Sequence, residues 1–171
     1  MRIRIIGSCG SGKSTAARQL AAMYGINYYE TDNLVWDRSE EGLRYPVEVR
    51  DRMLSDIVRQ ESWIIEGVHH KWGFESFEAA EYIYIIQPNP YIRDLRVVRR
   101  FIRTRFGLEA SNYKQTLSNL REMIFVWNKQ YDAVELSAIL EMTKVFSHKV
   151  YRVKNIRELV SHQSECRKTF V

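Results

Sequence analysis

The chain has 171 residues, of which 45% are hydrophobic and 27% are charged, and its formal net charge is +5. This composition excludes a disordered or fibrous chain, and no apolar run approaches the length of a membrane span. The length suits a single domain over residues 1–171 and is too short for two. A positive net charge favours polyanionic partners, but it does not separate nucleic acid from nucleotide phosphates.

Two further features bear on the cellular compartment. Cys9 and Cys166 lie near opposite ends of the chain without zinc-ligand spacing, so we expect no structural disulfide. The apolar segment at the N-terminus turns at once into a glycine loop and is too short for a signal peptide. We therefore expect a cytoplasmic protein with no membrane partner.

Short apolar strands alternate with helical periodicities, a pattern that predicts βαβ units, a mainly parallel sheet and an α/β fold. In the first part we predict strands at residues 2–6, 27–30 and 63–66 and helices at residues 13–25 and 47–61. Further along we predict a strand at 82–87, a helix at 91–106, a helical region at 112–145, a strand at 149–153 and a final helix. We expect the long helical region to break near Asp132 and Asn155 to cap the final helix.

The segment GSCGSGKST lies between the first strand and the first helix and matches the P-loop (Walker A) pattern G-x-x-x-x-G-K-[ST]. Backbone N–H groups of such a loop at a helix N-terminus form an anion nest, and glycine permits the tight dihedrals. Lys13 would reach the β- and γ-phosphates of ATP, and the Ser14 hydroxyl would ligate Mg²⁺. The candidate ATP-binding residues are Gly7, Ser8, Cys9, Gly10, Ser11, Gly12, Lys13, Ser14 and Thr15.

The loop has two alternative interpretations. A dinucleotide-binding fingerprint starting at Gly10 would need a glycine at position 15, where Thr15 stands, so it is set aside. A glycine-rich turn without a ligand is the second alternative. Cys9 is either a redox switch above the phosphates or a small residue whose backbone binds them.

Two carboxylates follow predicted strands, at the sheet edge where open α/β folds bind ligands. Asp32 comes after the second strand and Glu66 closes the third. We assign Asp32 as the base that orients the acceptor, and Glu66 as a magnesium or acceptor ligand. Loop capping by Asp32 and pairing of Glu66 with a lid arginine are the alternatives.

Three aromatic or imidazole side chains near these carboxylates are less informative. Adjacent histidines on a loop rarely point the same way, so we expect no metal site at His69 and His70. Trp36 either stacks on an aromatic acceptor or covers the edge of the sheet.

Arginines in the helix at residues 91–106 recur at spacings of three and four and share one face: Arg93, Arg96, Arg99, Arg100 and Arg103. The other side carries Leu95, Val98, Ile102 and Phe106. Like charges at this spacing repel by about 0.2 to 0.5 kcal/mol per pair, so an anion against the face would stabilise the helix. ATP phosphates are one candidate, with the arginines as catalytic residues of a mobile lid. A solvated basic face and a contact with the DNA backbone are the alternatives.

The segments GSCGSGKST, ETDNLVW and WIIEG and the arginine helix occur in an order that resembles the DNA topology modulation protein family, relatives of adenylate kinase and shikimate kinase. The resemblance covers most of the chain up to about residue 105. It implies a P-loop NTPase, nucleotide kinase-like three-layer fold: a five-stranded parallel sheet in order 2-3-1-4-5, helices on both faces and an arginine-rich lid at about residues 91–110. It also implies ATP binding, acceptor contact by Asp32 and a lid role for Arg96, Arg99, Arg100 and Arg103.

The chain departs from the family pattern at two places: Val68 and His69 stand where the family commonly has Asn-Tyr, and Gln87 where an acidic residue is frequent. The acceptor therefore stays unassigned. We expect an ATP- and Mg²⁺-dependent kinase that phosphorylates a small acceptor such as a nucleoside or nucleotide, with Ser14, Asp32 and Glu66 at the metal. The alternative is a nucleotide-dependent DNA-binding regulator that modulates DNA topology.

Overall fold

The computed structural model describes residues 1–40, 42–108 and 116–168. Residues 109 and 110, at the end of the predicted lid, lie outside the described residues, as do residues 112–115 at the start of the predicted helical region.

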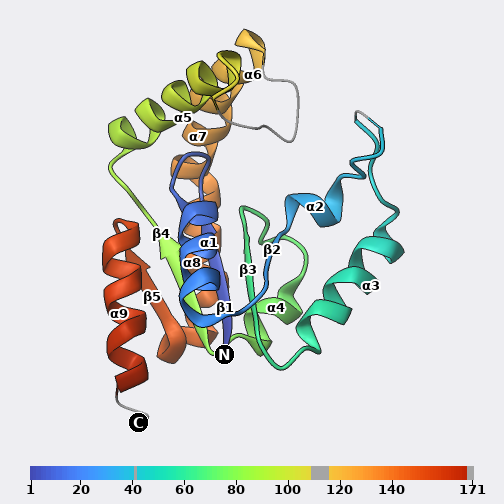
Figure 1. Ribbon diagram of the computed structural model, residues 1–171, viewed down its shortest axis with the longest axis vertical. Coiled ribbons are helices and arrows are strands. Elements are labelled where there is room, and N and C mark those ends of the chain that lie inside the picture. The colour runs from blue at the N-terminus through green and yellow to red at the C-terminus, as the bar shows by residue number, and fades with distance from the viewer. Residues whose placement is uncertain (41, 109–115, 169–171) are drawn as a thin grey trace.

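Within the described ranges, five strands form one sheet: β1 (Arg2–Gly7), β2 (Tyr28–Glu30), β3 (Trp63–Gly67), β4 (Tyr82–Ile86) and β5 (Val150–Val153). Neighbouring strands are parallel and their order is β2-β3-β1-β4-β5 (Figure 1). The predicted parallel sheet and its order are confirmed. Since β1 is central and its two neighbours come later in the chain, the connections diverge on either side of it, and the carboxyl end of β1 is where open α/β sheets ordinarily bind ligands.

Helices cover both faces of the sheet, which gives three layers (Figure 1). The larger helices are α1 (Lys13–Tyr24), α3 (Val47–Val58), α5 (Pro90–Arg105), α8 (Leu136–Thr143) and α9 (Ile156–Lys168), and two short ones are α2 (Asp32–Val35) and α4 (Phe74–Ala79). None of the helices in the described ranges combines the length and apolar character that crossing a bilayer requires.

Alternating residues of β1 build the two cores. Ile3 and Ile5 pack with Leu20 of α1 and Leu159 of α9 on one face. Ile6 faces the other side, where α3, α4 and α8 contribute their buried apolar residues, including Leu54, Ile57, Phe77 and Ile139. Both faces of the central strands are covered, so these strands are continuous apolar runs without the alternation of a half-exposed sheet.

Helix boundaries agree with the sequence signals where a cap is present. Gly25 ends α1 in the left-handed conformation, with its N–H donating to the Ala21 carbonyl. Asn155 begins α9, and its side chain accepts from the Glu158 backbone N–H at 3.0 Å, as predicted. The short helices α2 and α4 were not predicted, because a single turn leaves too little periodicity to recognise.

The predicted break near Asp132 is wrong. From Leu117 to Thr143 the chain stays helical through α6 (Leu117–Glu122), η1 (Met123–Trp127), α7 (Asn128–Gln130), η2 (Tyr131–Glu135) and α8, with η1 and η2 forming π-helical turns. The 3₁₀ segment η3 (Lys144–Lys149) then leads to β5. A π turn accommodates an extra residue without ending the helix, so a disturbed apolar period looks like a break in the sequence.

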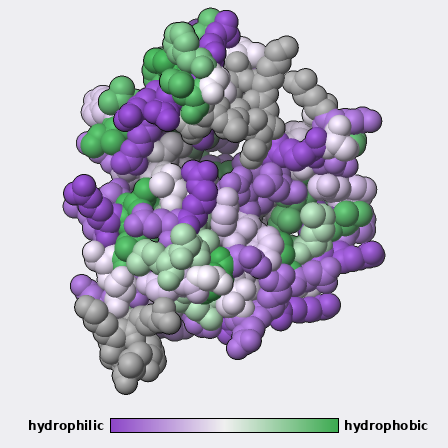
Figure 2. Space-filling model, in the orientation of Figure 1, coloured by the Kyte–Doolittle hydropathy of each residue, from purple (hydrophilic) through white to green (hydrophobic). Residues whose placement is uncertain are grey.

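Helix α5 projects beyond the sheet and buries a narrow seam. The buried residues are Arg93, Val97 and Phe101, whereas Leu95 is 67% and Phe106 is 75% exposed. Figure 2 shows hydrophobic and hydrophilic residues interleaved along this upper edge of the molecule. The side of α5 opposite the arginines, apolar in sequence, is therefore largely uncovered.

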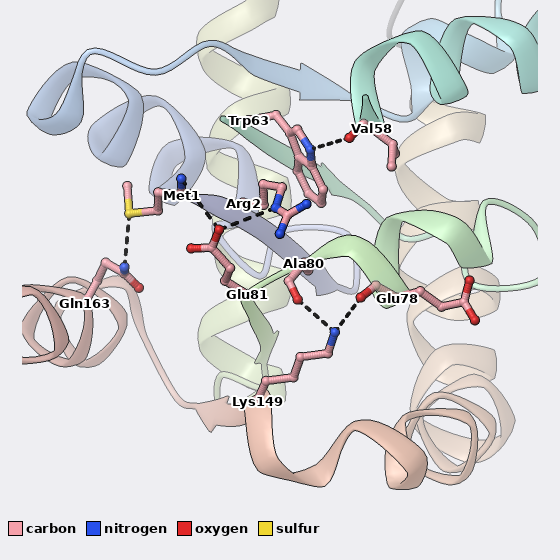
Figure 3. Close-up of polar contacts among 9 residues, drawn as sticks. All are labelled: Met1, Arg2, Val58, Trp63, Glu78, Ala80, Glu81, Lys149 and Gln163. Atoms are coloured by element: carbon pink, nitrogen blue, oxygen red, sulfur yellow. Dashed lines mark hydrogen bonds and ion pairs between the residues drawn. The ribbon is translucent and has the colours of Figure 1, made fainter. Parts of the chain in front are cut away.

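Polar contacts tie together the edge of the sheet where the strands begin (Figure 3). Lys149 donates to the carbonyls of Glu78 and Ala80 at the end of α4, at 2.6 and 2.8 Å. Glu81 pairs with the terminal amine of Met1 and with Arg2. These contacts fix the strand starts, and the opposite, carboxyl edge carries the charged residues described next.

Candidate functional site

The glycine loop, residues 7–15, joins β1 to α1 and lies beneath the first turns of α5. Gly10 has a positive φ of 76°, and a Cβ there would stand 2.7 Å from the Arg93 carbonyl oxygen. A side chain at Gly10 would therefore be strained and would push α5 away. The first backbone N–H groups of α1, from Lys13 onward, lack partners within the helix and carry its positive dipole end.

The glycine loop also carries side-chain hydrogen-bond donors. Lys13 Nζ donates to the Ser8 carbonyl at 3.4 Å, a long contact that a stronger acceptor would replace. The Ser11 hydroxyl is buried and has no partner among the described residues. Cys9 is a free, partly exposed thiol. The loop is thus rich in donors and suited to an anion.

Ser14 and Glu66 meet beside the loop. The Ser14 hydroxyl donates to Glu66 Oε1 at 2.6 Å, joining the first turn of α1 to the end of β3. Glu66 is 3% exposed, and its other oxygen, Oε2, has no hydrogen-bond partner in the described chain. A buried carboxylate oxygen without a hydrogen-bond donor is costly, and the positive charge of the buried Arg4 interacts with Glu66.

Glu30 is a further acidic residue of the site that was not predicted from the sequence. In the parallel register Glu30 pairs with Glu66, so both side chains leave the sheet on the same face. Burial and the charges of Glu66 and Asp32 raise the pKa of Glu30, against the opposing charges of Arg18 and Lys13. Glu30 lies at the end of the second predicted strand, but only the register of β2 against β3 shows that it lies beside Glu66.

Asp32 contacts His69, and the charge of Lys13 in the glycine loop also acts on it. Its Oδ1 lies 3.1 Å from Nε2 of His69, and its side chain is 55% exposed. Partial desolvation opposes ionisation of Asp32, but the hydrogen bond with His69 and the charge of Lys13 outweigh it and lower its pKa. Asp32 is therefore an ionised, accessible carboxylate that can orient a hydroxyl group.

A close approach of two backbones brings Asp32 and Glu66 into one site. The Thr31 N–H donates to the Glu66 carbonyl at 2.8 Å. A Cβ at Gly67 would overlap the Thr31 side chain, so glycine is required for this contact.

The two histidines after β3 point to different partners. His69 contacts Asp32, whereas His70 Nε2 lies 3.2 Å from Glu135 Oε2. Among the described residues, no group of three or more His, Cys, Asp or Glu side chains could hold a metal by itself. The guanidinium of Arg44 lies over the Trp36 ring, 4.3 Å from its centroid, so Trp36 makes a cation–π contact within the chain.

The arginines of α5 have different contacts and do not form one cluster. Arg96 Nη1 donates to the Ser11 carbonyl at 3.3 Å and so reaches the glycine loop. Arg93 is buried and pairs with Asp94 and Asp132, while Arg100 contacts the Met123 sulfur at 3.7 Å. Arg99 and Arg103 are exposed.

Comparisons with known proteins bear on the fold. No family model matches the chain, and no curated protein matches it. Among solved structures it is similar to the crystal structure of an uncharacterized protein from Eubacterium ventriosum ATCC 27560, with 14% sequence identity, a TM-score of 0.52 and coverage of 99% of this chain and 98% of that chain. At this identity the similarity concerns the fold alone: both chains share an α/β architecture over nearly their whole lengths.

Proposed function

We propose that the chain is an ATP- and Mg²⁺-dependent phosphotransferase with a P-loop kinase-like fold, which moves the γ-phosphoryl group of ATP to a small acceptor such as a nucleoside or nucleotide. The observation that carries this proposal is the Ser14–Glu66 pair beside the glycine loop. It combines a hydroxyl group, a buried carboxylate oxygen without a partner in the described chain, and an adjacent helix N-terminus. A phosphate chain with its cation would satisfy all three.

The donor set fits Mg²⁺, because hydroxyl and carboxylate oxygens are the ligands that this hard cation prefers. Ser14 and Glu66 would hold it, and the negative charge of Glu30 interacts with that of Glu66. Bound there, Mg²⁺ would offset the charge of the phosphate oxygens. Asp32, also expected at the metal, faces His69 and is better suited to the acceptor.

Each residue of the site has a part in the transfer. The loop N–H groups and Lys13 hold the phosphates, and Arg96 donates to the charge that develops on the transferred group. Asp32 orients the acceptor hydroxyl. The bond between the γ-phosphorus and its bridging oxygen breaks, a bond from phosphorus to the acceptor oxygen forms, and the hydroxyl proton passes to Asp32.

A screen for ADP release over nucleosides, nucleotides and small alcohols tests the proposal with the purified chain. We expect one acceptor class to stimulate release, and Lys13→Ala to reduce that rate at least about 100-fold because it removes a donor to the phosphates. Lys144→Ala, at an exposed lysine in η3, is the control and should keep full activity. Release that Lys13→Ala leaves unchanged would contradict the proposal.

A nucleotide-dependent DNA-binding regulator is the second candidate, favoured by the exposed side chains of Arg99, Arg103 and Arg105 on α5. Contacts with DNA phosphates release counterions, so affinity should fall steeply with salt. The double change Arg99→Ala and Arg105→Ala should reduce the slope of log K against log salt by about 2. If the chain does not bind duplex DNA, or binds it with an affinity that does not depend on salt, this candidate is wrong.

A further inference from the structure

The π-helical turn η2 carries two acidic side chains, three residues apart, that contact two different sides of the proposed site. Asp132 binds Arg93 of α5, and Glu135 binds the loop between β3 and α4, residues 68–73. In an α-helix, residues three apart point about 60° from each other. The wider π turn spreads the two directions further, which lets one short segment serve two partners.

Glu135 holds two consecutive residues of the β3–α4 loop. Its Oε2 lies 3.2 Å from His70 Nε2, and its Oε1 accepts from Lys71 Nζ at 3.0 Å. The side chains of His70 and Glu135 are only 9% and 16% exposed, so water screens the contact weakly. Side chains of consecutive residues ordinarily point in different directions. Because the Glu135 carboxylate binds both His70 and Lys71, it restricts the backbone conformation of these two residues.

The same loop carries the residue that touches Asp32. The His69 carbonyl accepts from Nη2 of the buried Arg4 at 2.8 Å, and the His69 ring lies against Asp32. With Glu135 on the next two residues, three successive positions of the loop are fixed from three different elements. Glu135 therefore restrains the two residues that follow His69.

Asp132 acts on the other side. Arg93 Nη1 donates to Asp132 Oδ1 at 2.7 Å, and the Arg93 side chain is 4% exposed. The Arg93 carbonyl packs against Gly10, and one turn later Arg96 reaches the Ser11 carbonyl. Loss of the Asp132 contact would free the start of α5 and with it the donor above the glycine loop.

We propose that Asp132 and Glu135 are positioning residues of the transfer reaction: Glu135 holds the β3–α4 loop on the acceptor side, and Asp132 holds the start of α5 on the nucleotide side. This inference rests on the proposed function, because it assigns the two sides of that same site. It predicts that two isosteric changes on one helical turn affect different segments and only one of them weakens nucleotide binding, whereas a merely structural turn would give similar effects.

The test compares Asp132→Asn and Glu135→Gln with Glu141→Gln, which removes the same charge from an exposed pair on α8. Amide hydrogen exchange is followed in residues 68–73 and 90–96, and the dissociation constant of ADP with Mg²⁺ is measured by calorimetry. Glu135→Gln should accelerate exchange in residues 68–73 about tenfold and change the dissociation constant of ADP less than about twofold. Asp132→Asn should accelerate exchange in residues 90–96 and raise the dissociation constant of ADP about tenfold. Glu141→Gln should change neither the exchange rates nor the dissociation constant.

A second variant guards against a folding defect. Lys71→Gln removes one half of the Glu135 contact at a side chain that is 72% exposed, and it should accelerate exchange in residues 68–73 about threefold. Unchanged exchange there in both Lys71→Gln and Glu135→Gln, or the same response of both segments to Asp132→Asn and Glu135→Gln, overturns the inference. If the unaltered chain binds no ADP, the proposed phosphotransferase is wrong, and the exchange pattern still decides whether η2 holds the two segments.

Discussion

Arg96 and Arg99 lie within one turn of α5 but in different surroundings. Both residues are exposed, and Arg96 also donates to the Ser11 carbonyl. Their spacing in the sequence places both side chains on one face of the helix. It does not show how far each side chain lies from the glycine loop. The contact of Arg96 arises from the place where α5 crosses the glycine loop.

If the chain is the proposed phosphotransferase, we expect Arg96→Ala to lower kcat about 100-fold, since it removes a donor next to the glycine loop, and Arg99→Ala to change kcat less than about threefold. Steady-state kinetics with the acceptor found in the ADP-release screen measures both. Equal losses in the two variants would mean that α5 acts through its total charge.

Glu30→Gln should stabilise the protein at neutral pH while weakening binding of ADP with Mg²⁺. The pKa of Glu30 is raised, first by burial and then by Glu66 and Asp32, so its ionisation opposes folding. The Glu30 contribution to stability is therefore most favourable below the ordinary carboxyl pKa and is lost as pH rises through the raised value. The gain from Glu30→Gln should thus appear at neutral pH and vanish in acid.

Water screens this half-buried carboxylate, so the gain should not exceed about 1 kcal/mol, or about 2 to 4 °C in Tm. Thermal unfolding at pH 7 and pH 4 measures it. A loss of stability at pH 7 would show that Glu30 is held by favourable contacts instead.

At the scale of elements, the sequence predicted the strands, the long helices and the glycine loop well, because each has a strong local signal. Gly25, Asn155 and the apolar runs of β3 and β4 belong to this group. Residues that depend on contacts distant in sequence were missed. Glu30 needed the strand register, and Glu135 needed a π turn that resembles a break.

Arg4 connects elements through the core. Its guanidinium donates to the Ile5, Ile65 and His69 carbonyls and lies over the Phe77 ring at 4.8 Å. Burial lowers the pKa of Arg4 to about 10, so it remains charged at neutral pH. This forked donor joins β1, β3 and the β3–α4 loop.

We expect Arg4→Met to lower the free energy of unfolding by about 2 to 4 kcal/mol, because three carbonyls lose a donor in the interior. Arg4→Lys keeps the charge but not the fork, and should still lose stability, though less than Arg4→Met. Urea unfolding measures both. Full stability of Arg4→Met would mean that water replaces the guanidinium without cost.

At the scale of the whole molecule, the two edges of the sheet differ. The edge where the strands begin is joined by paired contacts such as Lys149 to Glu78 and Ala80. The carboxyl edge holds the Glu66 oxygen and the Ser11 hydroxyl, which have no partner in the part of the chain that the structure describes. Unsatisfied groups at one edge reduce stability until a ligand pairs with them.

Binding of ADP with Mg²⁺ should therefore raise Tm. At a ligand concentration about 100 times the dissociation constant, the gain is about 2.7 kcal/mol, or about 5 to 10 °C for a chain of this length. Differential scanning fluorimetry measures the shift, which Lys13→Ala should abolish. A shift of the same size in Lys13→Ala would place the nucleotide elsewhere.

The central position of β1 also affects how the chain folds as it is synthesised. β1 leaves the ribosome before the other four described strands, but its two neighbours end at Gly67 and Ile86. The nascent chain cannot hold the glycine loop between fixed strands until Ile86 has emerged, since the pairing of β1 is long-range on both sides. A ribosome-bound chain stalled before β4 should therefore lack nucleotide affinity, although every residue of the loop is already present.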